Sequence, residues 1–157
     1  MKEILFESIS RPLIFVHLLA AIALVGGLTH GTVFLALSEK RAKTAYLKRA
    51  AKFWKMILWT LAITMATGLT AYPTYRIRTR AEFLDEHFPL ASGLFDLKEN
   101  YAAIVVVLVL ACVLLRREPE DTESHSILHN WFYYLATGLT WIVALCGIWV
   151  TLHRGMA

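Results

Sequence analysis

The chain has 157 residues, of which 57% are hydrophobic and only 18% are charged, and its formal net charge is +4 at pH 7. Soluble domains carry about a quarter charged residues, so this composition, with a mean hydropathy of +0.53, argues against an ordinary soluble domain. The positive charge does not indicate a nucleic-acid partner, because basic loops beside membrane helices produce it routinely.

The apolar residues fall in long blocks, and a helix needs about 20 consecutive, mostly apolar residues to cross a bilayer. Four segments meet this requirement: residues 12–37, 53–72, 92–115 and 131–152. The connections between them are too short for a separate soluble domain. We therefore predict an all-α integral membrane protein whose single domain, residues 1–157, is a bundle of four transmembrane helices embedded in lipid.

The first predicted span contains two histidines, His17 and His30, with no charged residue between them. At about 100° per residue, these two imidazoles point about 140° apart on a helix. His30 shares one face with the small residues Gly26 and Gly27, whereas His17 points elsewhere. Acidic residues before the span and the length of the apolar run indicate a retained helix rather than a cleaved signal peptide.

The connection after the first span is strongly basic, with Lys40, Arg41, Lys43, Lys48, Arg49 and Lys52. Short loops rich in Lys and Arg usually stay in the cytoplasm. We therefore expect both termini and the loop at residues 73–91 on the outer, periplasmic side of a bacterial inner membrane.

The outer loop that follows the second span carries Arg76, Arg78 and Arg80. Their alternation indicates an extended segment, and Pro73 is expected to end or kink the preceding helix. Ion pairs with acidic residues at the start of the third helix, such as Asp96, would fold this loop back onto the bundle. A docking site for a partner protein or a quinone head group is the alternative interpretation of the arginines.

The fourth span places His129 on a continuous stripe of small and polar residues that includes Tyr133, Thr137 and Gly147. Such stripes are typical of helix–helix contacts in membranes. The third span has no comparable face, so we expect it to contact lipid. His87 and His125 lie in polar surroundings and are interpreted as solvated. The two cysteines, Cys112 and Cys146, lie inside predicted spans, which indicates buried thiols rather than a disulfide.

An imidazole in hydrocarbon is costly and usually faces the protein interior or a cavity. His30 and His129 lie on the predicted inward stripes of their helices, and two imidazoles from facing helices can hold a haem iron from both sides. Gly26 and Gly27 would let the flat macrocycle approach the backbone. The depths differ, however: His30 lies about 10 Å inside its span, by the helical rise, whereas His129 lies just before its own.

In its layout of spans and helical histidines the chain resembles small four-helix b-type cytochromes of bacterial membranes. The resemblance implies b-type haem between the first and fourth helices. A second haem, held by His17 and His153 near the outer surface, is a further reading. It is weakened by the spacing, because His17 and His30 do not share a face, as one helix serving two haems would require.

Two functions remain open on this basis. One is a membrane electron-transfer subunit that exchanges electrons with quinone or with another membrane or periplasmic redox subunit. The other is a non-catalytic scaffold subunit of a larger respiratory or transport complex, with histidines that are hydrogen-bonded inside the bundle. A transporter has less support, because acidic residues occur only near the ends of the spans. The sequence contains no nucleophilic triad, phosphate loop, zinc motif or CxxC pair, so no enzymatic reaction is assigned.

Overall fold

The computed structural model describes residues 6–41, 44–115 and 123–154, nearly all of them helical and none in a strand. The elements, in chain order, are a 3-10 turn η1 (Glu7–Ile9), α1 (Ser10–Arg41), α2 (Thr44–Thr74), a π-helical segment η2 (Tyr75–Leu84), α3 (Asp85–His87), α4 (Pro89–Leu114) and α5 (Glu123–Arg154). Four helical stretches in the described residues are long and apolar enough to cross a membrane. The predicted all-α, multi-pass membrane protein with four spans is confirmed to this extent.

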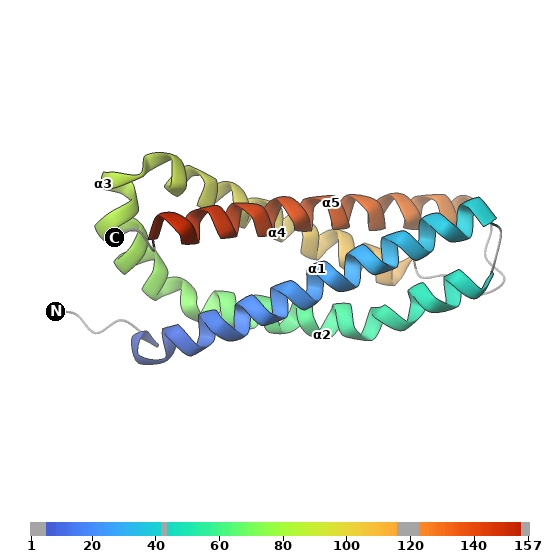
Figure 1. Cartoon of the computed structure of the whole chain (residues 1–157), viewed down its shortest axis with the longest axis horizontal. Helices are drawn as coiled ribbons and strands as arrows, with labels where there is room; N and C mark the ends of the chain where they lie inside the picture. Colours follow the sequence, from blue (N-terminus) through green and yellow to red (C-terminus); the bar gives the residue numbers. More distant parts are fainter. Residues whose placement is uncertain (1–5, 42–43, 116–122, 155–157) are drawn as a thin grey trace.

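The four long helices pack as two pairs (Figure 1). α1 lies along α2, α4 lies along α5, and α1 also contacts α5. The beginning of α1 and the end of α5 lie at the end of the bundle that also holds α3. We call this the α3 end. The end of α1 and the beginning of α2 lie at the opposite end.

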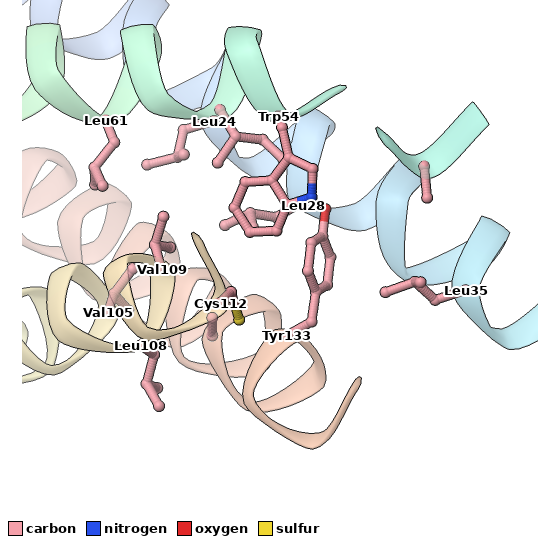
Figure 2. Packing of buried hydrophobic residues seen from close by; sticks show 13 residues of the cluster. Leu24, Leu28, Leu35, Trp54, Leu61, Val105, Leu108, Val109, Cys112 and Tyr133 are labelled. Atoms are coloured by element: carbon pink, nitrogen blue, oxygen red, sulfur yellow. The ribbon is translucent and has the colours of Figure 1, made fainter. Parts of the chain in front are cut away.

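The main apolar cluster joins all four long helices (Figure 2), and along each of them it lies towards the end opposite α3. Tyr133 lies at its centre, edge-on to Trp54 with ring centroids 5.5 Å apart. The buried members are Leu24, Leu28, Leu35, Ala50, Trp54, Ile57, Leu61, Val105, Leu108, Val109, Cys112, Tyr133 and Ala136. This cluster includes four residues of α4, so the third span contacts protein as well as presenting exposed residues such as Val107 and Leu114.

A second, smaller cluster lies at the α3 end and consists of Leu84, Ala91, Phe95 and Val150. Between the two clusters, the buried residues that α2 and α5 contribute are small: Thr67, Ala71, Thr74 and Thr140. None of these is larger than threonine. Along α2 and α5, the fully buried side chains between the two clusters are therefore small or polar, whereas larger residues of this stretch, such as Met65, Tyr72 and Leu139, are partly buried and pack against the clusters.

The segment after α2 differs from the extended loop expected at Arg76, Arg78 and Arg80. Pro73 lies inside α2 and the chain continues as the π-helical η2. A proline removes one backbone donor and crowds the preceding turn, and π-helical turns accommodate such disturbances without leaving the helix. A helix also satisfies its backbone N–H and C=O groups with hydrogen bonds inside the segment. An extended segment at the edge of a membrane would leave these groups without partners.

The predicted ion pairing between this segment and the third span is confirmed for Arg80. Its guanidinium donates two hydrogen bonds to Asp96 of α4, at 2.6 and 2.9 Å. Arg78 in turn donates to Glu7 at 2.9 Å and to Glu82 at 3.1 Å. Two arginines therefore tie η2 to α4 on one side and to the segment before α1 on the other.

Candidate cofactor site

His30 does not lie on the inward face of α1. Its side chain is exposed, its Nδ1 donates to the Gly26 carbonyl of the same helix at 2.8 Å, and its ring stacks on Phe53 with centroids 5.7 Å apart. A Cβ on Gly26 would meet nothing within 4 Å, whereas one on Gly27 would meet Met56 of α2. The prediction that His30 and Gly26 face the other helices is therefore wrong. The two adjacent glycines differ, because only Gly27 lies against α2.

His129 is buried at the edge of the main cluster. Its ring lies 6.0 Å from Trp54 and 6.1 Å from Tyr133, measured between centroids, and its Nδ1 lies 3.3 Å from Asn130 Oδ1. The side chain is inside the bundle, as the polar stripe on α5 predicted, and neighbouring aromatic rings surround it.

A haem held between α1 and α5 by His30 and His129 does not fit this packing. The two imidazoles contact adjacent residues of α2, Phe53 and Trp54, whose side chains point about 100° apart. In addition, the hydroxyl of Tyr133 occupies the place that a Cβ on Gly31 would take. The space between α1 and α5 near His30 is therefore filled by the Tyr133 side chain.

His17 lies on the inward face instead. The buried positions of α1 include Leu24, Gly31 and Ser38, which recur every seven residues, and His17 is the preceding member of this series. A seven-residue repeat is the pattern of helices that cross at a small angle. Helical periodicity correctly separated His17 from His30 but could not say which of the two faces meets the other helices.

The His17 ring is held by α2. Its Nδ1 lies 2.9 Å from the Thr64 carbonyl oxygen and 3.4 Å from the hydroxyl of Thr67, which itself donates to the Ile63 carbonyl. Because a carbonyl oxygen only accepts, Nδ1 carries the proton. The neutral ring then has a free lone pair on Nε2, and metal-binding histidines are commonly oriented by this kind of bond from the other nitrogen.

Gly68 makes room for the ring on the same face of α2. A Cβ at this position would lie 3.1 Å from His17 Cε1 and 3.2 Å from Nδ1. These distances are shorter than an ordinary van der Waals contact. Any side chain at residue 68 would therefore displace the imidazole from the Thr64 carbonyl.

Lys98 belongs to α4, in the other helix pair. Since α4 begins at Pro89, Lys98 lies more than two turns into a membrane-length helix. Its ammonium lies 4.8 Å from the centroid of the Phe95 ring, and its Cδ lies 3.8 Å from where a Cβ on Gly147 of α5 would be.

His17, Thr64 and Gly68 together form what we call the His17 site, between α1 and α2. Along these two helices the site lies between the main apolar cluster and the α3 end of the bundle. Sequence reasoning missed Gly68 as a member of this site. The seven-residue series on α1 was the available signal that His17 faces the other helices.

The other histidines do not add ligands to this site among the described side chains. His87 is exposed and donates from Nδ1 to the Phe83 carbonyl at 3.0 Å. The side chains of His125 and His153 fall outside the described residues, although both lie on α5. Within the described part of the chain, no group of three or more His, Cys, Asp or Glu residues could hold a metal ion by itself.

Comparison of the chain with models of protein families, with curated proteins and with solved structures found no match in any of the three. Any functional conclusion therefore depends on the chemistry of the site.

Proposed function

We propose that this chain is a membrane electron-transfer subunit that holds one b-type haem at the His17 site, with His17 as an axial ligand. The observation that carries the proposal is the hydrogen bond from His17 Nδ1 to the Thr64 carbonyl, inside a membrane-length bundle. It leaves Nε2 as the free basic nitrogen, which is the state of an imidazole that binds iron. Imidazole groups within transmembrane segments are costly and usually mark a functional site.

The surroundings of His17 support the same assignment. Gly68 leaves room for the imidazole beside the Thr64 carbonyl, and the fully buried residues that α2 and α5 contribute between the two apolar clusters are small. Bound haem supplies a one-electron redox couple, and axial ligation and burial are the means by which the protein sets its potential.

In this proposal the electron partners are quinone or another membrane or periplasmic redox subunit, and the membrane is the bacterial cytoplasmic membrane. The basic connection between α1 and α2 supports a cytoplasmic position for that end. The α3 end, with the His17 site, then faces the periplasm.

The test is a reduced-minus-oxidised absorption spectrum of protein produced with ample haem, combined with a haem extraction assay. We expect a Soret band in the wild-type protein, its loss in His17→Ala, and its retention in His30→Ala. The last variant is a matched control, because it removes an imidazole from the same helix. Added imidazole should restore the band in His17→Gly, since the ligand would then enter from solution.

Two results would contradict the proposal. A wild-type protein without a Soret band would remove the haem function altogether. Loss of the band in His30→Ala but not in His17→Ala would move the site to the other end of the bundle.

The second candidate function is a non-catalytic scaffold subunit. It is favoured by the exposed position of His30 on a membrane helix, because an imidazole facing lipid is stabilised when a neighbouring helix covers it. This function predicts colourless protein that migrates as part of a larger assembly in native gels, and a smaller particle for His30→Leu. A coloured protein of monomer size would exclude it.

A further inference from the structure

The first turns of α2 present three lysines on one exposed face. Lys48, Lys52 and Lys55 follow one another at intervals of four and three residues, which places them within about 60° on a helix. All three side chains are exposed, and Trp59, one turn later on the same face, is 71% exposed. The buried residues of this part of α2 lie on the opposite side of the helix and are Ala50, Trp54, Ile57 and Leu61. The lysines therefore point away from the bundle.

Lys55 marks one boundary of a long uncharged run. Residues 56–75 carry no charge, and Arg76 follows them. This run spans about 30 Å at the helical rise, which is the thickness of the hydrocarbon core of a bilayer. Lys52 lies about 4.5 Å further out than Lys55, and the polar headgroup layer on each side is about 5–7 Å thick. The ammonium groups of Lys52 and Lys55 therefore lie at the depth of the lipid phosphates.

The charge of these lysines is not neutralised by α2 itself. The helix contains no Asp or Glu, and none of the three lysines has an ion pair within 4.0 Å among the described side chains. Like charges three or four residues apart on a helix repel each other. A phosphate between Lys52 and Lys55 would pair with both ammonium groups and offset this repulsion.

We propose that this face of α2 binds an anionic phospholipid, whose phosphate lies between Lys52 and Lys55 while Lys48 adds positive potential from the water side. Basic residues beside a membrane helix attract anionic headgroups. A zwitterionic lipid gains less, because its phosphate already has a cation in the same headgroup. The indole of Trp59 packs against the lipid one turn deeper, since tryptophan favours the interface.

This inference is independent of the haem. His17 contacts α2 at the Thr64 carbonyl and beside Gly68, and both residues lie on the side of the helix opposite the lysines. A failure of the lipid site would therefore leave the proposed function standing, and a protein without haem would leave the lipid site standing.

The test uses Trp59 as the reporter. Purified protein is reconstituted into vesicles of phosphatidylcholine and phosphatidylglycerol in equal amounts, and bromine is carried by the acyl chains of one lipid or of the other. Bromine quenches the fluorescence of tryptophans that the lipid contacts, and subtraction of the signal of Trp59→Phe protein isolates the contribution of Trp59. We expect phosphatidylglycerol to bind here about fivefold more tightly, which corresponds to about 1 kcal/mol.

Three double variants identify the groups responsible. Lys52→Gln with Lys55→Gln should abolish the preference, whereas Lys52→Arg with Lys55→Arg should keep it, because arginine also pairs with phosphate. Arg11→Gln with Arg76→Gln is the matched control. It removes two exposed cations from α1 and η2, at the other end of the bundle, and should leave the preference at Trp59 unchanged.

Three results would overturn the proposal. Equal quenching of wild-type protein by the two brominated lipids would mean that the lysines are only hydrated or face an acidic protein segment. A preference that survives in Lys52→Gln with Lys55→Gln would assign the selection to groups other than these ammonium groups. An equal loss in the Arg11 and Arg76 control would show that net charge, and not this face of α2, attracts the anionic lipid.

Discussion

Gly31 shows how a single residue sets the distance between α1 and α5. The hydroxyl of Tyr133 lies where a Cβ on Gly31 would be, whereas a Cβ on Gly26, five residues earlier, would meet nothing within 4 Å. We therefore expect Gly31→Ala to destabilise the fold by about 1–3 kcal/mol, the usual cost of overpacking. Gly26→Ala should be neutral or stabilising by up to about 1 kcal/mol, because alanine favours the helix. Unfolding by SDS titration in mixed micelles measures both.

Tyr133 provides the control for this prediction. Its buried hydroxyl has no hydrogen-bond partner among the described residues, so Tyr133→Phe should be tolerated. Combined with Gly31→Ala, it should recover part of the lost stability and not all, because the ring carbon Cζ would still lie 2.7 Å from the new Cβ. Equal effects of alanine at Gly31 and Gly26 would show that α1 and α5 do not approach each other here.

At the scale of elements, η2 is held to α4 by the Arg80–Asp96 pair. Arg80→Ala should increase the hydrogen-exchange rate of the amides in residues 75–84, because it removes both hydrogen bonds to α4. The double-mutant coupling with Asp96→Ala should be about 0.5–1 kcal/mol, since the pair is partly exposed to solvent. Raised salt should weaken the coupling.

Arg76 is the matched control on the same element. It is exposed and lies over the Tyr72 ring, 6.0 Å from its centroid, so Arg76→Ala should leave exchange in η2 nearly unchanged. The exchanged pair Arg80→Asp with Asp96→Arg should restore part of the protection. Equal exchange in the Arg80→Ala and wild-type proteins would mean that the proline-containing turn alone maintains η2.

At the scale of the whole molecule, an orientation in the membrane can be predicted from charge. The connection between α1 and α2 is basic, and such loops are retained in the cytoplasm. α1 begins and α5 ends at the α3 end (Figure 1), so both should face the periplasm. Alkaline phosphatase fused after residue 157 should be active, and green fluorescent protein at the same place should not fluoresce. The reverse result would place the His17 site on the cytoplasmic side.

The sequence by itself determined the class of protein and the number of spans. Both follow from the length and polarity of contiguous segments, because a bilayer of fixed thickness demands about 20 apolar residues in a row and requires each segment to pair its own backbone. The pairing of Arg80 with Asp96 was also predictable, since these opposite charges lie on two consecutive segments, η2 and α4, that only the short α3 separates. The helical form of η2 was not, because alternating arginines suit an extended segment as well as a π-helix.

Only the tertiary structure decided which face of each helix meets the others. In a water-soluble helix the apolar stripe marks the inside, but α1 is apolar around most of its circumference, so hydrophobicity does not distinguish the two faces. Membrane helices associate through close steric fit and hydrogen bonds between particular partners. Gly68 and the Thr64 carbonyl on α2 therefore bring His17 inside, and Tyr133 on α5 fills the space against Gly31, while His30 is left on the surface. All of these partners lie on other helices. The periodicity of α1 alone could therefore show that His17 and His30 point in different directions, but not which of them faces the bundle.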